Sequence, residues 1–451
     1  MGSSFSLLAP YDEHDELVED RANHDTMDDE DNDEHELAHN LEANDHPDWL
    51  QLPDDLIVEI VKRLDVVDRA KLSNVCKSWS RVALNKDIPV HQFPLLMLPS
   101  KIKSDHVRLF DTSRSLMYRF NLPDSVVQRG GWCFGSTKGW LLIATLEKNY
   151  TPHISLLNPV SGQIIKLPSI TAFEACTNDP YSFADLLVTK MELYFLSEDD
   201  IFISAIFDDN KLAICIAGDE EWTIVSESGD HNFYDDMCFF KGTLYVLHRC
   251  SGSDGDDDRD GVVLLNSALT FQFSESSSIA IKLVSLIGGQ TLGREIIEQN
   301  GFDIITNICR TAYLVESHGE LLIVDRVSDG LSYDDDVQSF EYAKTKQFEI
   351  FKMVNGSASK SMCKLRNDQI VFMGGRGPCV SLSAKDFNDK VKGNCIHFLD
   401  EYDVFDFFDL PPFVSRESGI CCLDDGRITR CYPTIKFPMD SRMTWLTPQL
   451  I

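Results

Sequence analysis

The chain has 451 residues, of which 43% are hydrophobic and 25% charged, a balance typical of folded globular proteins. Its formal net charge is −32, from 41 basic and 73 acidic residues, which argues against nucleic acid and anionic membranes as partners. No stretch approaches the roughly 18 consecutive apolar residues of a membrane span, and the N-terminus lacks the pattern of a secretory signal or transit peptide.

The acidity is concentrated at the N-terminus. Residues 1–48 contain 17 Asp or Glu and a single Arg, so they carry half of the net charge. Aromatic residues are nearly absent, and such a segment cannot bury enough apolar surface to offset the entropy lost on ordering. We therefore expect a disordered acidic tail over residues 1–47, which serves either as a solubilising segment or as an acidic interaction arm.

The pattern becomes helical at Trp49. Pro53 suits the first turn of a helix, and the acidic residues Asp54 and Asp55 suit the positive end of its dipole. An apolar stripe at helical spacing follows, formed by Leu56, Ile57, Ile60, Val61 and Leu64. Asp68 is the expected cap of a second short helix, and Ser73 the expected cap of a third, which carries Val75, Cys76, Trp79, Val82 and Ala83.

The order of these residues resembles an F-box. The matching positions are Leu52-Pro53-x-Asp55-Leu56-Ile57-x-x-Ile60-Val61-x-x-Leu64 and, after a gap, Leu72-x-x-Val75-Cys76-Lys77-x-Trp79. The departures are small: Val61 stands where Leu is common, and Asp65 stands where Pro often follows the first helix. We therefore assign residues 48–90 to a three-helix, all-α F-box.

The resemblance implies that this segment docks on a Skp-type adaptor, which links to a cullin ubiquitin-ligase scaffold. It places the adaptor contacts on one helix face, formed by Leu52, Pro53, Leu56, Ile57, Ile60 and Leu64. It also implies that the second part of the motif packs the unit and forms part of the contact, through Val75, Cys76 and Trp79. An N-terminal helical cap folded onto the rest of the chain is the alternative.

The remainder of the chain predicts an all-β domain, because short apolar runs alternate with Gly, Asn, Asp and Ser turns. The candidate strands are Trp140–Thr145, His153–Asn158, Leu193–Leu196, Ile201–Phe207, Leu212–Ile216, Glu221–Val225, Met237–Phe240, Thr243–His248, Gly261–Asn266, Ala312–Ser317, Glu320–Arg326, Phe348–Met353, Gln369–Met373 and Cys395–Leu399. Hairpins are expected around Lys241-Gly242 and His318-Gly319, and a similar unit begins at Gly135.

These hairpins recur at the spacing of propeller blades, which are about 40–50 residues long. We expect a large β-propeller of seven blades, or of six if the first and last strands share a blade, over residues 111–451, with a linker at 91–110. Three segments resemble the KIB-type, kelch-like propellers of plant F-box proteins: Asn158-Pro159-Val160-Ser161-Gly162 with Leu167-Pro168, Phe239–Val246, and Trp445-Leu446-Thr447-Pro448.

Catalytic and metal-binding patterns are weak. The glycine-rich segment at 374–378 lacks the lysine of a phosphate loop and favours a tight turn. Asp256, Asp258, Asp260 and Gly261 fit the first half of a calcium loop, but Ser267 stands where a bidentate Glu is needed, so a solvated loop is favoured. The 13 cysteines are scattered without zinc-ligand spacing, and His231, His248, His318 and His397 are isolated in the sequence. We predict no catalytic residues, no metal and no cofactor.

The sequence thus predicts the substrate-recognition subunit of a Skp–cullin–F-box ubiquitin ligase. The F-box would bind the adaptor and the propeller would bind a protein substrate, without a covalent step in this chain. We expect neither nucleic acid nor membrane as a partner, and a location in the nucleus and/or the cytoplasm. The alternatives are an F-box protein that acts outside a ligase as a decoy or scaffold and, with less support, a propeller enzyme.

Overall fold

The computed structural model describes only part of the chain: residues 4–7, 49–85, 87–88, 92–98, 104–146, 152–169, 188–197, 200–207, 211–227, 232–250, 263–272, 278–287, 293–299, 302–329, 332–334, 339–341, 344–354, 357–375, 377–387, 391–399, 418–429 and 443–447. The predicted disordered tail lies outside these residues except for strand β1 (Ser4–Leu7). The predicted acidic loop at 254–260 also lies outside them.

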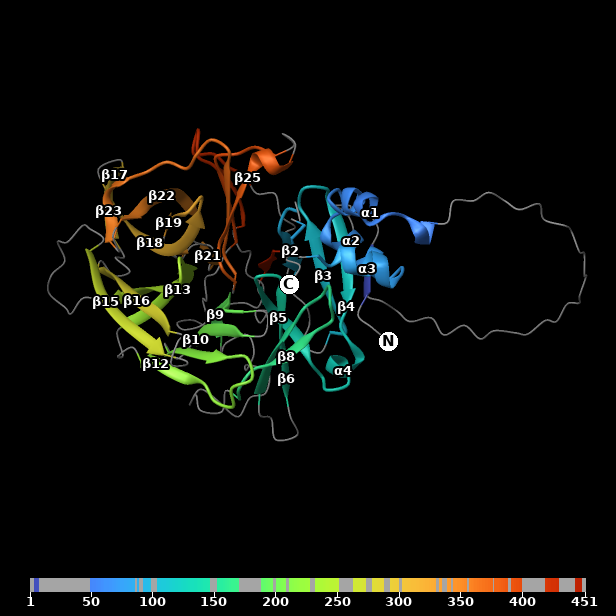
Figure 1. Cartoon of the computed structure of the whole chain (residues 1–451). Helices are drawn as coiled ribbons and strands as arrows, with labels where there is room; N and C mark the ends of the chain where they lie inside the picture. The colour runs from blue at the N-terminus through green and yellow to red at the C-terminus, as the bar shows by residue number, and fades with distance from the viewer. Residues whose placement is uncertain are drawn as a thin grey trace, which may run out of the picture.

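Residues 49–88 form a compact helical unit. It contains a 3₁₀ turn, η1 (Trp49–Gln51), and the helices α1 (Asp54–Val61), α2 (Val66–Ser73) and α3 (Lys77–Ala83). Figure 1 shows the three helices grouped beside strands β3 and β4. Their small core consists of Ile57, Val61, Val82, Ala83 and Ile88, with the partly buried Leu52, Val58, Leu72 and Trp79 packed against it. The three-helix prediction is confirmed.

Both predicted helix caps were wrong. Asp65 caps α2, since its side chain accepts a hydrogen bond from the backbone N–H of Asp68 at 2.8 Å. Ser73 is the last residue of α2, and its hydroxyl donates to the Ala70 carbonyl. Cys76 occupies the N-cap position of α3 without a side-chain cap. Each helix begins where the backbone leaves an extended conformation, at Asp65 and Cys76, which the residue types alone do not reveal.

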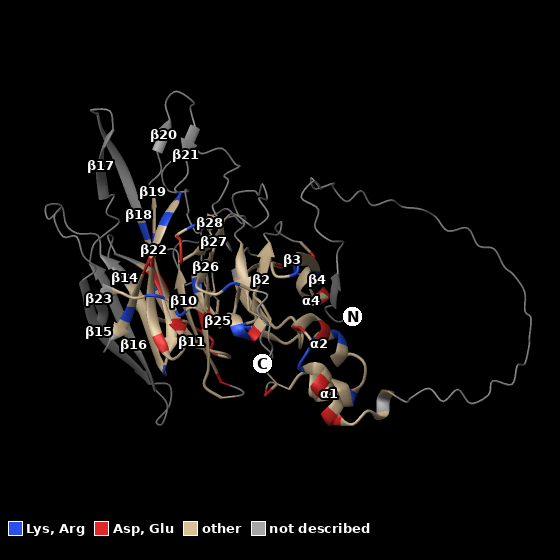
Figure 2. Cartoon of the chain, turned by 90° about the horizontal axis from the view of Figure 1, so that it is seen from above, with Lys and Arg blue, Asp and Glu red and all other residues tan. Residues whose placement is uncertain are grey.

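Among the described residues, the β domain consists of six sheets with four or five strands each and one two-stranded sheet, and Figure 2 shows the chain from above. In spatial order, the first sheet contains β1, β4 (Leu116–Asn121), β3 (His106–Asp111), β2 (Leu95–Leu98) and β29 (Thr444–Leu446). The second contains β5 (Trp132–Thr137), β6 (Trp140–Leu146), β7 (Pro152–Leu157) and β8 (Ile164–Lys166). The third contains β12 (Thr223–Glu227), β11 (Lys211–Ile216), β10 (Ile201–Phe207) and β9 (Val188–Phe195).

The remaining sheets continue along the chain. The fourth contains β13 (Asn232–Phe240), β14 (Thr243–Cys250), β16 (Ser278–Ile287) and β15 (Val263–Gln272). The fifth contains β17 (Gly293–Gln299), β18 (Phe302–Ser317), β19 (Glu320–Asp329), β22 (Thr345–Val354) and β23 (Ser357–Met362). The sixth contains β25 (Val380–Ser383), β24 (Gln369–Met373), β26 (Cys395–Phe398), β27 (Gly419–Cys422) and β28 (Ile428–Thr429). A separate hairpin joins β20 (Ser332–Asp334) to β21 (Ser339–Glu341), and the short helical elements are α4 (Asp124–Val127) and η2 (Ala384–Phe387).

All fourteen predicted strands overlap observed ones, and the predicted helical unit followed by a large β-propeller is confirmed. The linker expected at 91–110 is wrong, because β2 and most of β3 lie in that range and pair within the first sheet. The six-or-seven blade count stays a prediction, since the six larger sheets are those of the described residues alone.

Three hairpin turns share one backbone geometry. Lys138-Gly139, Lys241-Gly242 and His318-Gly319 all have positive φ at both positions, between 42° and 83°. This is the type I′ conformation, whose twist matches that of the flanking strands and which favours glycine at the second position. The two hairpins predicted at Lys241-Gly242 and His318-Gly319 are therefore confirmed.

Side chains and backbone groups link each sheet to the next around a closed ring. Every neighbouring pair of sheets also shares an apolar cluster, so the core is a series of wedges between sheets. The polar links, in order around the ring, are Ser136 Oγ to Trp445 O (2.7 Å), Thr137 Oγ1 to Met191 O (3.0 Å), Phe239 N to Glu192 Oε1 (3.4 Å), Leu314 N to Asp236 Oδ2 (2.7 Å), Ser317 Oγ to Ser381 Oγ (2.7 Å) and Trp445 Nε1 to Met373 O (3.1 Å).

Two ion pairs with buried carboxylates belong to this ring, and in one of them the lysine is buried as well. Lys190 Nζ lies 2.9 Å from Asp236 Oδ1, and Lys138 Nζ lies 2.8 Å from Glu192 Oε1. Burial, the largest effect, raises the pKa of Glu192, and the Lys138 ammonium opposes that shift. Each carboxylate also accepts a backbone N–H from the next sheet, so the charges join three sheets rather than two.

Asp236→Ala should lower the free energy of unfolding by about 3–5 kcal/mol, because it removes the partner of a buried ammonium group. The substitution also leaves the Leu314 N–H without its acceptor. Urea denaturation would measure the effect. Glu320→Ala is the matched control, since it breaks an exposed pair with Lys352 and should cost less than about 1 kcal/mol. Equal losses from the two variants would contradict the proposed importance of the buried pair.

Candidate functional site

The most distinctive surface of the described residues is apolar and lies on the helical unit. Nine large hydrophobic side chains are exposed among those residues, and five of them belong to the helical unit. We name these five the apolar face: Trp49, Leu56, Ile60, Val75 and Leu84. The other four are scattered over the second, third and fifth sheets: Ile164 on β8, Leu196 directly after β9, Ile224 on β12 and Met362 on β23. A concentration of this kind on a small unit marks an interaction surface rather than ordinary surface variation.

Helix α1 divides its apolar stripe between the core and the surface. Successive residues of an α-helix are about 100° apart, so the stripe is wider than one contact can cover. Ile57 and Val61 point into the helical unit and are almost fully buried, whereas Leu56 and Ile60 are 52% and 38% exposed. The helix therefore has one apolar edge that packs the unit and another that is free to meet a partner.

The predicted adaptor residues fall into three groups. Pro53, Leu56, Ile60 and Val75 are exposed. Leu52, Leu64, Cys76 and Trp79 are half-buried, and Leu52 and Trp79 pack against the core of the unit. Ile57 is 1% exposed, so in this conformation it supports α1 from inside and does not offer a contact.

Two exposed residues of the apolar face were not predicted. Trp49, at 62% exposed, lies in η1 just before the matched motif, and Leu84 follows α3 at its C-cap. The sequence did contain a signal for Trp49, because a large aromatic residue marks the point where the acidic tail ends. Leu84 has no such signal, since its exposure depends on where α3 ends.

Polar contacts hold the helices that carry the apolar face. Arg81 on α3 pairs with Asp54 at the start of α1, and Ser78 Oγ donates to the same carboxylate at 3.2 Å. Arg69 on α2 is completely buried, and it donates to the carbonyls of Val61 (3.0 Å) and Ile88 (2.9 Å). Arg69 thereby supplies a second donor to the Val61 carbonyl at the C-terminal end of α1, which also accepts from the Leu64 N–H at 3.1 Å.

The residues considered for catalysis do not come together. Gly374 and Gly375 have positive φ, and a Cβ on Gly375 would lie 2.5 Å from Thr444 Oγ1, so this segment is a close approach to β29. His318 lies in a turn, and His397 is buried in β26 among Phe93, Phe372 and Trp445. Within the described part of the chain, no three His, Cys, Asp or Glu side chains form a group that could hold a metal ion.

A cleft of about 980 Å³ lies where the helical unit meets the first and sixth sheets. Its lining includes Arg63 and Asp65 from the helical unit, Arg114 from the first sheet, and Lys392 and His397 from the sixth. Burial lowers the pKa of His397 to about 3, so this imidazole is neutral at physiological pH. The cleft thus combines a charged rim with an uncharged histidine.

The buried histidine predicts an acid-sensitive fold. The folded pKa of about 3 lies below the unfolded value of 6.5, so protonation favours the unfolded chain. The contribution of His397 to stability is complete above pH 6.5 and should decline by up to about 1.4 kcal/mol per pH unit between pH 6.5 and 3. The unfolding midpoint of the wild type should therefore fall relative to that of His397→Leu as the pH is lowered through this range, and parallel curves would contradict the prediction.

Comparisons with known proteins agree with this architecture. The F-box domain model matches residues 49–91, and the KIB1-4 beta-propeller model matches residues 109–422. The chain belongs to the plant F-box proteins with a KIB1-4 β-propeller. From here the helical unit is named the F-box.

Curated F-box proteins from Arabidopsis thaliana are similar to this chain. The F-box/kelch-repeat protein At1g57790 is 30% identical over 208 residues, which cover 45% of this chain and 54% of the relative. The F-box/kelch-repeat protein At3g18720 is 31% identical over 213 residues, which cover 45% and 52%. The F-box protein At2g17036 is 22% identical over 356 residues, which cover 72% and 77%. The matched part thus spans about half the length of the first two relatives. No helix among the described residues is long and apolar enough to cross a membrane.

Proposed function

We propose that this chain is the substrate receptor of a Skp–cullin–F-box ubiquitin ligase. The observation that carries the proposal is the apolar face, which concentrates exposed hydrophobic side chains on the one part of the chain that matches an F-box. Leu56, Ile60 and Val75 would enter a groove of the Skp-type adaptor, and Trp49 would extend the contact on the N-terminal side of Leu52. Aliphatic and aromatic anchors of this kind supply most of the affinity of helix-in-groove complexes.

The propeller would bind a protein substrate and hold it near the ubiquitin-charged enzyme. The chain itself would form no covalent intermediate and would need no cofactor. Its contribution would be proximity, because a lysine held close to a thioester reacts at a high effective concentration. With a net charge of −32, the receptor should favour substrates with neutral or basic surfaces, in the nucleus and/or the cytoplasm.

The decisive experiment is co-purification of the full chain with a Skp-type adaptor, for the wild type and for Leu56→Ala with Ile60→Ala. Each truncation should remove roughly 1–3 kcal/mol of binding energy, so the double variant should lose about 30-fold or more in affinity. Because both side chains are exposed, the unfolding midpoint should change little, and thermal denaturation would check this.

A matched control uses exposed isoleucines of the propeller. Ile164 and Ile224 are each 39% exposed, close to the 38% of Ile60, and they lie on β8 and β12. The double variant Ile164→Ala with Ile224→Ala should capture the adaptor as well as the wild type does. If the wild type captures no adaptor, or if both double variants lose it equally, the proposed role of the apolar face is wrong.

A further inference from the structure

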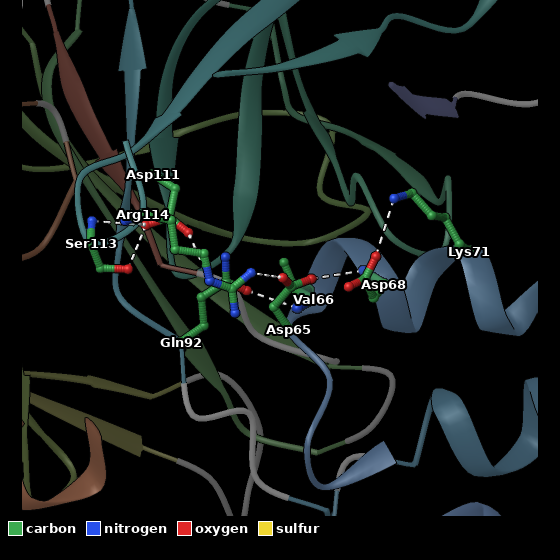
Figure 3. A network of polar contacts seen from close by, with 8 residues as sticks. All are labelled: Asp65, Val66, Asp68, Lys71, Gln92, Asp111, Ser113 and Arg114. Carbon is green, nitrogen blue, oxygen red and sulfur yellow. Dashed lines mark hydrogen bonds and ion pairs between the residues drawn. The ribbon is translucent and has the colours of Figure 1, made fainter. Parts of the chain in front are cut away.

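A charged bridge connects the F-box to the first sheet of the propeller. Arg114 lies in the turn between β3 and β4. Its Nη1 lies 2.5 Å from Asp65 Oδ2, and its Nε lies 3.8 Å from Asp111 Oδ2 (Figure 3). Asp65 belongs to the F-box and Asp111 to the first sheet. One guanidinium therefore faces carboxylates from both domains.

The two carboxylates depend on this cation. The side chains of Asp65 and Asp111 are each 3% exposed, whereas that of Arg114 is 49% exposed. Burial alone would lower the pKa of Arg114, but its hydrogen bond to Asp65 and the charges of both carboxylates raise it above the ordinary value. Without Arg114, two buried negative charges would lie on opposite sides of the same boundary, and like charges there repel.

Asp65 and Asp111 also accept hydrogen bonds within their own elements, helix α2 and the β3–β4 turn. Asp65 caps α2 by accepting from the Asp68 N–H, and Asp111 accepts from the N–H (2.9 Å) and the hydroxyl (2.6 Å) of Ser113 in the β3–β4 turn. Figure 3 shows Arg114 between these two local networks. The start of helix α2 is thus linked to a fixed turn of the sheet.

Apolar packing covers the same boundary. Val66 and Val67, the first residues of α2, are buried in the cluster that includes Leu95, Leu109 and Tyr118 of the first sheet. The Val66 N–H, which has no partner within its own helix, donates to Gln92 Oε1 at 2.7 Å. Helix α2 therefore belongs to the core of the propeller as well as to the F-box.

We propose that Arg114 is a positioning residue that locks the F-box to the first propeller sheet, so that the two domains move as one rigid body. Because of this lock, the adaptor bound to the F-box and the substrate bound to the propeller are held at a fixed separation. The rigid junction stands on the contacts described here. Its meaning for ubiquitin transfer rests on the proposed function.

The test measures the distance between the domains in the full-length protein. Spin labels would be placed through a genetically encoded amino acid at Lys77 on α3 and at Glu220 in the β11–β12 turn, which are both exposed. Pulsed dipolar spectroscopy should give one narrow distance distribution for the wild type. Arg114→Glu, which brings a third carboxylate to the junction, should at least double the width of that distribution.

Three further variants make the result specific. Arg114→Lys keeps a cation at the junction and should restore a distribution close to that of the wild type. Arg114→Gln is a milder disruption and should broaden the distribution, which keeps the test valid if the Glu variant does not fold. Arg81→Glu is the matched control, because it breaks an exposed ion pair within the F-box, so it should leave the width unchanged.

Adaptor binding, measured for the same variants, distinguishes a failure of the rigid-junction proposal from a failure of the proposed function. Arg114→Glu should bind the adaptor within about twofold of the wild type, because the apolar face does not include Arg114. If Arg114→Glu and Arg114→Gln both keep the narrow distribution, the rigid-junction proposal is wrong, whatever the adaptor does. If the wild type binds no adaptor while Arg114→Glu broadens the distribution, the junction stands and the proposed function fails.

Discussion

The pairing of β29 with β2 is the interaction on which the rest of the fold depends. Trp445 in β29 lies opposite Leu96, its carbonyl accepts from Ser136 of the second sheet, and its indole N–H donates to Met373 of the sixth. One residue near the C-terminus therefore joins three sheets. Since ring closure pairs most strand edges, it removes the exposed edges that otherwise promote aggregation. The F-box packs against the same sheet, so both the β2–β29 pairing that closes the ring and the junction with the F-box depend on the first sheet.

The two parts of the chain use polar groups in different ways. Within the ring, buried charges such as Asp236 and Glu192 are surrounded by donors from neighbouring sheets, so they fix how the sheets fit together. On the F-box, charged pairs such as Lys62 with Glu59 are exposed and contribute little stability. The stability of the F-box comes instead from its small apolar core and from α2, which packs on the first sheet. Leu56 and Ile60 can therefore remain exposed without loosening the unit.

The sequence predicted the features that depend on residues close to one another along the chain. Helical spacing located α1, and a Lys-Gly or His-Gly pair between apolar runs located the type I′ hairpins. It could not decide which half of the α1 stripe faces outward, because Leu56 and Ile57 are both apolar and only the packing of α3 separates them. It also missed contacts between distant positions: Arg114 and Asp65 are 49 residues apart, and Ser136 and Trp445 are 309 apart. No local pattern distinguishes such an arginine or serine from an ordinary surface residue, and the predicted linker failed for the same reason.

Ring closure by β29 also sets an order of events during synthesis. The F-box ends near residue 88 and β29 begins at Thr444, so about 350 residues separate them. At a synthesis rate of about 5–20 residues per second, that interval lasts tens of seconds. During this interval β2 cannot yet pair with β29, whereas all residues of the F-box helices have already been synthesised. The end of the protein that carries the apolar face is thus complete well before the ring can close, and a chain that stops short of residue 444 would present that face beside an open propeller.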